Sequence, residues 1–473
     1  MLRIISSLIG VKRKQPDDTP IVAPTAENSG LTTPSILNVS SFASLIDQFS
    51  DLAKTLILPF PTNYSFSIPN RFSTTRNSAS IAVFNYDVRE SFRILLKEVQ
   101  ALVDQDLDET IRYIGNMGAG KSHNLAALVV FLRKCKLHNL GITKDVVYIP
   151  SCEYLSMHKV DVMTAALIDA FPTDKAKLSK LKEWSELIAF VQSRPQRSIL
   201  FIFDDWQFAL SEANVPESEN NRRYLLHQDL IHLTLYQYRI EAISAFTPLL
   251  TSVSSRDQNP HHTKFVYLYG GLTDREWAAR KARSAFISCL SEEEEAQLRD
   301  YTGGVPLYLT AIGCYEGDLS ERMAMFHKYE GINIVDNLEH SSRDYAAVDE
   351  RKFTRQMRYA VNGEGEYLDE SLYDHRYFYR DSDYMLRPVS GFVREAMREI
   401  LRDFATKAYY RQLDKPWIDK AMAIGNDAVK EFAFKTYAVY AVTRDPSRYF
   451  EGVPNDIAEC TVKYYDGDYP AFY

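Results

Sequence analysis

The stretch "TIRYIGNMGAGKSHNLAALVV", residues 110–130, constrains the fold more than any other part of the chain. It begins as a short apolar strand, passes through a glycine-rich turn, and continues with the spacing of an apolar helix. Within it, Gly115 to Ser122 satisfies the phosphate-loop pattern G-x-x-x-x-G-K-[ST]. Because the pattern lies between a strand and a helix, as its mechanism requires, the sequence predicts an α/β domain that binds a nucleotide.

Each residue of this loop has an expected contact with a nucleotide. The glycines let successive N–H groups curl into one anion-sized nest, and the following helix adds the positive end of its dipole. Lys121 is expected to reach the β- and γ-phosphates, and the Ser122 hydroxyl to ligate Mg²⁺. The expected cofactors are ATP, with GTP left open, and Mg²⁺. The predicted nucleotide-binding residues are Gly115, Asn116, Met117, Gly118, Ala119, Gly120, Lys121 and Ser122.

A second part of the site is expected at "SILFIFDDW", where two acids follow the apolar run Ile199–Phe203. Asp204 is expected to hold Mg²⁺ together with Ser122, usually through water, and Asp205 to orient or deprotonate the attacking water. The predicted catalytic residues are therefore Lys121, Asp204 and Asp205. Aspartate reaches less far than the glutamate common at the second position, so a nucleotide-bound interaction module with little turnover stays open beside an ATPase. A polar turn that merely ends the strand is the plain alternative.

Several weaker candidates complete the list. A polar residue at the tip of a neighbouring strand could sense the γ-phosphate, and an arginine could stabilise charge during phosphoryl transfer. The segment "TGGVPLYL", residues 302–309, either packs near the nucleotide base or only joins two helices. The candidates for the sensor are Ser244 and Thr247, and those for the arginine are Arg222, Arg223, Arg239 and Arg256.

Periodicity and composition predict four regions: a flexible N-terminal arm (1–80), an α/β core (81–270), a helical lid-like part (271–330) and an aromatic-rich, mainly helical region (331–473). Within the arm, residues 40–60 have helical spacing and could dock onto the body. In the core, short apolar strands alternate with helices, which indicates a parallel sheet. The strands are expected at 110–115, 145–150, 198–205 and 240–247, and the helices at 121–139, 162–171, 177–193 and 222–239.

Composition excludes several other classes of protein. The net charge of −8 argues against a protein that coats nucleic acid, and the five widely spaced cysteines argue against a disulfide framework or a structural zinc site. No apolar run approaches the roughly 18 residues of a membrane span, and no standard signal peptide is evident. The segment at 367–384 offers aromatics and arginines that either grip single-stranded nucleic acid or form packed core, so a nucleic-acid partner stays open.

Together these segments resemble the P-loop NTPase domain of Crinkler effectors and of the related retrotransposon-hot-spot proteins. The resemblance covers about residues 110–400. Besides the loop and "FIFDDWQFAL", it is carried, in this order, by "VVYIPSCEYL", "ISAF", "YLYGGLTDREW", "TGGVPLYL" and "YDHRYFY". A weaker resemblance, in the loop and the "IP" strand, is to the GTP-binding protein of the mitochondrial small ribosomal subunit.

The first resemblance implies an AAA- or STAND-like ATPase core in which Lys121, Ser122 and Asp204 take the roles given above. It also implies an effector that is secreted and acts in a host cell, often in the host nucleus, and, in many members, a nuclease-like domain. A protein partner or a homo-oligomer is expected as well. The chain departs from the family in two places, since it has neither a trafficking motif of the Leu-Phe-Leu-Ala-Lys type nor a clear C-terminal nuclease core. The expectation on location is therefore an intracellular protein, and a secreted one if the effector resemblance holds.

Overall fold

A computed structural model describes most of the chain, in the stretches 41–62, 68–72, 74–76, 82–107, 109–210, 217–243, 263–363, 372–381 and 385–412. The chain divides into two units, residues 27–398 and residues 1–26 with 399–473. Of the second unit, the structure describes only the last part of helix α17 (Gly391–Gln412). The first unit holds the predicted site.

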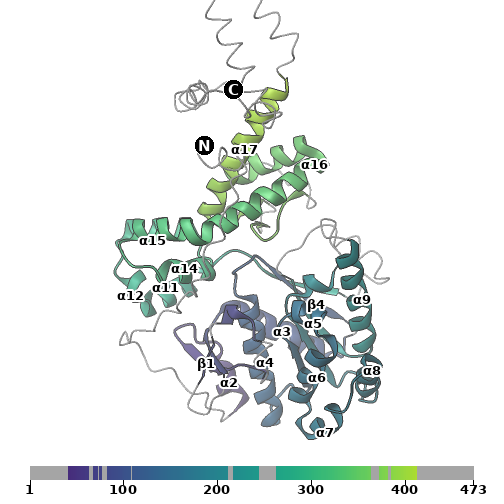
Figure 1. The fold of residues 1–473 in the computed structure, drawn as a ribbon. Coiled ribbons are helices and arrows are strands. Elements are labelled where there is room, and N and C mark those ends of the chain that lie inside the picture. Colours follow the sequence, from purple (N-terminus) through teal and green to yellow (C-terminus); the bar gives the residue numbers. More distant parts are fainter. Residues whose placement is uncertain are drawn as a thin grey trace, which may run out of the picture. The chain divides into compact units, whose positions relative to one another are not determined.

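A five-stranded parallel sheet forms the centre of the first unit, in the order β5-β6-β7-β4-β8 (Figure 1). Its strands are β4 (Thr110–Gly115), β5 (Asp145–Ile149), β6 (Ile199–Phe203), β7 (Tyr238–Ile243) and β8 (Thr263–Leu268). Because all five run in parallel, their carboxyl ends meet at one edge, where ligands bind in open α/β sheets. The loop after β4 and the acids after β6 therefore share this edge, with β7 between their strands. The predicted α/β fold with a phosphate loop is confirmed.

Helices connect these strands and cover both faces of the sheet. They are α3 (Glu90–Asp104), α4 (Lys121–Leu137), α5 (Cys152–Met157), α6 (Lys159–Ala170), η3 (Pro172–Asp174), α7 (Lys175–Leu178), α8 (Trp184–Gln192), η4 (Trp206–Ala209) and α9 (Glu217–Leu233). The helix predicted at 177–193 is two helices, since a new helix starts at Trp184 with a capping box between Glu183 and Glu186. The strand predicted at 240–247 begins earlier, at Tyr238, and the helix predicted at 222–239 ends at Leu233.

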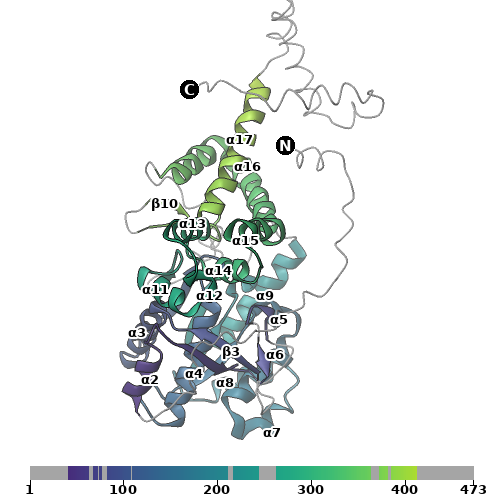
Figure 2. The ribbon, with the colours of Figure 1, turned by 90° about the vertical axis from the view of Figure 1, so that its left-hand side faces the viewer.

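The strands are apolar on both faces because each face has its own core. In β5, Val146 and Tyr148 belong to a cluster with α3 and α4, whereas Val147 and Ile149 belong to a second cluster with α5, α6, α8 and α9. Figures 1 and 2 show α3 and α4 on one side of the sheet and α6, α8 and α9 on the other. This two-sided burial explains the near-continuous apolar runs in the sequence.

The segment predicted as a flexible arm differs from the prediction between residues 41 and 76. It contains α2 (Phe42–Gln48), β1 (Thr55–Pro59), η2 (Asn70–Phe72) and β2 (Thr75–Arg76), and it joins β3 (Ala82–Asp87) in an antiparallel sheet of order β1-β3-β2. Phe49, which follows α2, packs against Phe92 of α3 and Phe131 of α4 at ring-centroid distances of 5.1 and 5.3 Å. These apolar contacts hold the segment on the core despite its polar composition. Residues 1–40 lie outside the described residues.

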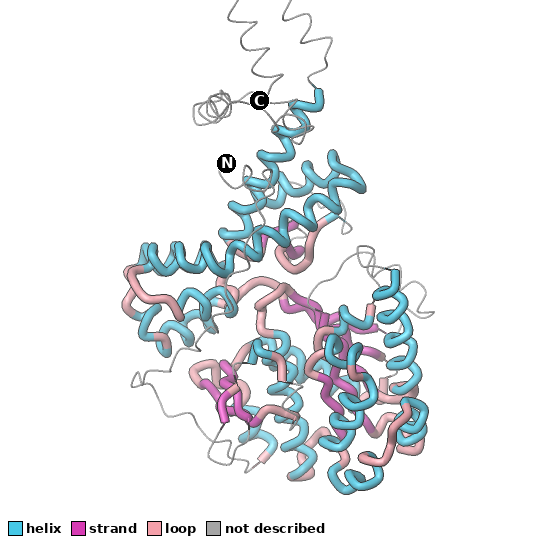
Figure 3. Tube along the Cα trace, viewed as in Figure 1, coloured by secondary structure: helices cyan, strands magenta, loops and turns pink. Residues whose placement is uncertain are grey.

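The described residues beyond the sheet, in the stretches 269–363, 372–381 and 385–412, are mainly helical, as predicted, and include a short two-stranded sheet (Figure 3). Its elements are α11 (Asp274–Arg283), α12 (Ala285–Ser288), α13 (Glu292–Thr302), α14 (Pro306–Gly313), α15 (Leu319–Phe326), η6 (His327–Gly331), α16 (Ile332–Asn362), β9 (Phe378–Arg380), β10 (Leu386–Pro388) and α17. A capping box between Thr273 and Glu276 starts α11. None of the helices in the described stretches is long and apolar enough to cross a membrane.

A buried ion group crosses the middle of the sheet. Glu241 of β7 is fully buried, and its carboxylate lies 3.0 Å from Arg112 Nε on β4 and 2.7 Å from Arg239 Nε on β7. Burial acts to raise the pKa of Glu241, but the charges of Arg239 and Arg112 outweigh it and lower the pKa below its ordinary value. The group therefore ties the strand of the loop to its central neighbour.

Replacing Glu241 by alanine is expected to lower the free energy of unfolding by about 3–5 kcal/mol, because the buried arginines lose their carboxylate. Urea denaturation measures this. Glu292→Ala, at an exposed glutamate in the first turn of α13, is the matched control and should change stability by less than about 0.5 kcal/mol. Equal stability of both variants would contradict the role of the ion group.

Candidate functional site

The phosphate loop has the backbone conformation that its glycines allow. Gly118 and Gly120 have φ values of 78° and 97°, in the left-handed region. A Cβ on Gly118 would also lie 2.7 Å from the Cβ of Leu307. Helix α4 starts directly after Gly120, so its N-terminus points at the loop. The glycine turn that the motif predicts between β4 and α4 is therefore present in the structure.

The backbone of this loop offers hydrogen-bond donors for an anion. Among the described residues, none accepts a hydrogen bond from the backbone N–H groups of Gly118, Gly120, Lys121 or Ser122. Unpaired N–H groups at the start of a helix, together with its dipole, form an anion site. The donor set therefore suits the phosphates of a nucleotide.

Lys121 is buried beside this donor set. Its Nζ donates hydrogen bonds of 2.7 Å to the carbonyl oxygens of Gly115 and Asn116. Burial lowers the pKa of Lys121 to about 8, although the charges of Asp204 and Asp205 act to raise it. Both of these hydrogen-bond acceptors are neutral carbonyl oxygens, and a triphosphate would give the ammonium group a negatively charged acceptor.

The acids after β6 lie next to the loop. The Ser122 hydroxyl lies near enough to the Asp204 carboxylate to act to lower its pKa, so the two predicted Mg²⁺ ligands are neighbours. Asp204 is fully buried, and burial together with the charge of Asp205 raises its pKa to about 6. Asp205 has a left-handed φ of 56°, and its backbone N–H donates to Asp204 Oδ1 at 3.0 Å. The turn thus directs both carboxylates toward the loop edge of the sheet.

An arginine that sequence reasoning missed bridges these acids. Arg71, in η2, donates to Asp205 Oδ2 at 2.6 Å, to Asp204 Oδ2 at 2.9 Å and to the carbonyl oxygen of Pro150 at 2.6 Å. Burial alone would lower the pKa of Arg71, but the charges of Asp204 and Asp205 raise it above its ordinary value. No motif marks this residue, because it lies in the polar stretch "SIPNRFSTTR" at a distance of 133 residues from Asp204.

The residues fit a magnesium–nucleotide pair. Mg²⁺ prefers oxygen ligands and commonly takes one or two carboxylates plus substrate phosphates. Ser122 and Asp204 supply a neighbouring hydroxyl and carboxylate, and the positive guanidinium of Arg71 shows that this acid pair accepts a cation. The unpaired N–H groups and Lys121 supply the phosphate side.

The C-terminal region holds the loop from its other side, through the buried side chain of Asn116. Asn116 Nδ2 donates to the carbonyl oxygens of His375 at 2.9 Å and Phe378 at 3.2 Å, and its Oδ1 accepts from the N–H of Gly270 at 3.1 Å. The N–H of Met117 donates to the carbonyl oxygen of Arg376 at 3.3 Å. The loop therefore contacts the "YDHRYFY" segment directly.

The buried residues of that segment also bear on the nucleic-acid hypothesis. Tyr373, Tyr377 and Phe378 are buried, so these three rings pack in the protein and present no stacking surface. Of the two alternatives for this segment, these three aromatic side chains therefore fit the packed core.

A second tie connects the loop to α11. Arg89 donates to the Ala119 carbonyl oxygen at 3.1 Å and to Glu276 Oε1 at 2.7 Å, and both Arg89 and Glu276 are buried. Glu276 also accepts from the N–H groups of Glu90 and Thr273. Glu276, the capping glutamate of α11, is thus bound to the N-terminus of α3 and, through Arg89, to the loop.

The "TGGVPLYL" segment joins two helices and also touches the loop. Gly303 ends α13 in the left-handed conformation, and Pro306 begins α14. The N–H of Leu307 lies 3.4 Å from the Gly118 carbonyl oxygen. The backbone of Gly303 is so close to Gly271 that a Cβ on Gly271 would lie 2.0 Å from the Gly303 carbonyl oxygen. The segment is therefore a helix joint that also packs on the phosphate loop, and its packing near the nucleotide base stays a prediction.

The remaining arginine candidates lie in other ion pairs. Arg222 and Arg223 pair with Glu219 of the same helix, and Arg239 pairs with Glu241 and donates to the hydroxyl groups of Thr110 and Thr234. None of these contacts involves Asp204, Asp205 or the loop. Ser244, Thr247 and Arg256 lie outside the described residues.

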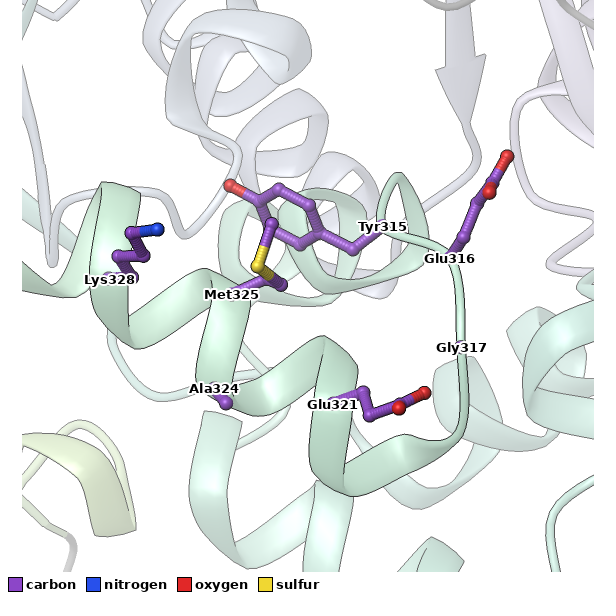
Figure 4. A pocket seen from close by; sticks show the side chains of 7 residues that line it. All are labelled: Tyr315, Glu316, Gly317, Glu321, Ala324, Met325 and Lys328. Atoms are coloured by element: carbon purple, nitrogen blue, oxygen red, sulfur yellow. The ribbon is translucent and has the colours of Figure 1, made fainter.

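Two surface cavities lie apart from this site. One, of about 620 Å³, is open to solvent in the helical region (Figure 4), and the other, of about 400 Å³, lies along α16. In Figure 4, Tyr315, Met325 and Lys328 lie on one side of the cavity and Glu321 on the other. Neither cavity includes a residue of the loop or of the acid pair. At the loop edge, Arg71 pairs with both acids, and the Lys121 ammonium group lies near enough to feel their charge.

Comparisons with known proteins give no close relative: no protein-family model and no curated protein matches the sequence. Among solved structures, the chain is similar to the ORC2 protein of Aeropyrum pernix (12% identity, 68% of this chain and 94% of that chain, TM-score 0.37). It is also similar to DnaA of Aquifex aeolicus bound to AMPPCP (15% identity, 80% and 95%, TM-score 0.31). A third is a STAND protein with a tetratricopeptide repeat sensor from Pyrococcus horikoshii (13% identity, 78% and 49%, TM-score 0.28). Because these scores are low, the fold is assigned from the strand order and loop of this chain.

Replacing Asn116 by alanine is expected to lower the free energy of unfolding by about 3 kcal/mol, since three buried hydrogen bonds of about 1 kcal/mol each are lost. It should also speed tryptic cleavage after Arg376, whose neighbours lose their anchor. Urea denaturation and limited proteolysis measure the two effects. Asn362→Ala, at an exposed asparagine that ends α16, is the control. Unchanged cleavage after Arg376 would argue against the anchor.

Binding of a magnesium nucleotide is expected to be strongest between about pH 6 and pH 8. Below pH 6, protonated Asp204 no longer ligates Mg²⁺, and apparent affinity should fall about tenfold per pH unit. Above pH 8, Lys121 of the free protein loses its charge, and affinity should fall again. Titration with a fluorescent ATP analogue across pH measures the profile. In EDTA the acid limb should vanish, and its persistence there would exclude Asp204 as its source.

Proposed function

We propose that the chain is a Mg²⁺-dependent P-loop nucleoside triphosphatase that binds and hydrolyses ATP. The observation that carries this proposal is the proximity of Ser122 and Asp204 beside the unpaired N–H groups of the loop. A chance glycine turn needs no acid from another strand next to its serine. Asp204 is separated from Ser122 by 82 residues of sequence (204 − 122), and β7 lies between their strands, so the fold itself builds this pair.

Each residue has a role that follows from its position. The N–H groups of Gly118 and Gly120 and the ammonium group of Lys121 would bind and orient the phosphates. Ser122 and Asp204 would hold Mg²⁺, which neutralises charge on the phosphates when bound. Asp205, directed toward the same edge, would hold the attacking water and take up its proton.

A nucleotide-controlled interaction module is the second candidate, and one observation favours it. Asn116, Met117, Gly118 and Ala119 are each bonded to residues outside the loop, and three of them to the chain beyond residue 270. Phosphate binding in the loop would therefore act on that chain directly. In this case nucleotide is held and scarcely turned over, and its presence sets the state of a binding surface.

The resemblance to Crinkler-type proteins extends the proposal to an effector that acts in a host cell. Its support is the resemblance of the segments quoted above, two of which reach the loop: Gly270 donates to Asn116, and Arg376 accepts from Met117. Expression of a fluorescent fusion in host cells, scored for nuclear accumulation, is the test, and a uniformly cytoplasmic fusion would count against nuclear action.

Lys121→Ala is expected to weaken binding of Mg²⁺·ATP at least about 100-fold, because charge-assisted hydrogen bonds to the phosphates are lost. Calorimetric titration with ATP and with GTP measures affinity and preference. Lys136→Ala, at the exposed far end of the same helix, is the control and should bind as the wild type does.

The two candidates differ in turnover. Asp205→Asn should retain ATP binding and lose most phosphate release if the chain is an ATPase. If the wild type releases no phosphate above background while it binds ATP, the interaction module is the better description. Equal ATP affinity of wild type and Lys121→Ala would overturn both.

A further inference from the structure

Arg71 occupies the acid pair more completely than a surface ion pair does. Its two terminal nitrogens donate to Asp204, Asp205 and the Pro150 carbonyl oxygen, all within 2.9 Å. Asp204 is fully buried and Asp205 is 7% exposed, so these bonds form in a largely desolvated place. Charge-assisted hydrogen bonds are strong in such surroundings. The contact is therefore a substantial part of how the protein accommodates two buried carboxylates.

The backbone beside Arg71 is held by contacts other than those with the acids. Its neighbour Phe72 is buried, with its ring 4.8 Å from that of Phe60, 5.6 Å from that of Phe84 and 4.8 Å from that of His123. His123 belongs to the first turn of α4, directly after Ser122. The aromatic cluster fixes the backbone at Phe72, and the Arg71 side chain extends from it to the acids.

Arg71 and Mg²⁺ would bind the same carboxylate, because Arg71 donates to Asp204 Oδ2 and the other oxygen, Oδ1, already accepts from the Asp205 N–H. A metal ion ligated by Ser122 and Asp204 needs the carboxylate that Arg71 now holds at 2.9 Å. Two cations beside Asp204 would also repel each other at short range in a medium of low dielectric constant. The two cations therefore compete for Asp204.

The geometry points to Arg71 as an internal competitor of Mg²⁺: its guanidinium occupies Asp204 and Asp205 in the nucleotide-free protein and leaves Asp204 when the magnesium nucleotide binds. This inference rests on the proposed function, whose site it regulates. It makes the free protein a self-inhibited state, and the apparent affinity for Mg²⁺·nucleotide is lowered by the fraction of molecules in which Arg71 holds the acids. A nucleotide without metal does not need Asp204, and so it does not compete with Arg71.

The test compares Arg71→Gln with Arg93→Gln, which removes a positive charge from an exposed arginine of α3. Affinity for a fluorescent ATP analogue is measured in excess Mg²⁺ and in EDTA, and the ratio of the two affinities is taken for each protein. In Arg71→Gln the ratio should rise about tenfold or more over the wild type, because one strong charge-assisted competitor is removed. In Arg93→Gln it should stay within about twofold. Arg71→Lys, which keeps a charge but cannot bridge two carboxylates and a carbonyl in the same way, should lie between.

An equal or smaller ratio in Arg71→Gln overturns the inference. In particular, affinities that fall alike with and without Mg²⁺ would make Arg71 a phosphate contact. The proposed function fails separately, if the wild type binds the analogue under neither condition. In that event the role of Arg71 is tested with Mg²⁺ alone, by comparing thermal unfolding in Mg²⁺ and in EDTA. The metal-dependent rise of the melting temperature should be larger in Arg71→Gln than in the wild type. Equal rises would overturn the inference.

Discussion

Two carboxylates buried at one edge of a parallel sheet require a positive charge beside them, and the site depends on this constraint. Desolvation and the charge of Asp205 raise the pKa of Asp204 to about 6, and the charge of Arg71 acts to lower it and so favours the ionised form. The described chain provides positive charge from Arg71, which holds both acids, and from the nearby Lys121. A metal ion would supply more charge at the same point. The electrostatic demand of Asp204 and Asp205 thus links the beginning of the chain, the phosphate loop and the expected ligand.

The phosphate loop is also in contact with several distant segments of the first unit. Asn116 bonds to backbone groups from residues 270, 375 and 378, and Arg89 joins Ala119 to the capping glutamate of α11. These contacts use the Asn116 side chain and the Ala119 carbonyl oxygen, and they leave the N–H groups of Gly118 and Gly120 free of them. A loop that only cradled an anion would need none of them. The arrangement therefore couples the state of the loop to the helical region more closely than a free-standing nucleotide fold would.

The sequence was sufficient for the parts of the site that depend on local geometry. Gly115 to Ser122 and the acids after Phe203 each follow a buried strand, and parallel strands bring their carboxyl ends together without further information. Arg71 could not be predicted in this way, because nothing near it in the sequence marks a contact made across 133 residues. The strand Thr55–Pro59 was missed for a related reason: its partner, β3, lies beyond a polar connection, and pairing is a tertiary property. The sensor candidates Ser244 and Thr247 stay predictions.

The close approach of Gly271 to Gly303 and Gly304 has a consequence for how motion passes through the protein. Here two segments of main chain touch without side chains between them, and the Leu272 N–H donates to the Gly304 carbonyl oxygen at 2.9 Å. Side chains can absorb a small displacement by changing rotamer, whereas backbone in direct contact cannot. The segment that follows β8 and the joint between α13 and α14 are therefore in rigid backbone contact. A displacement of one segment would move the other with it.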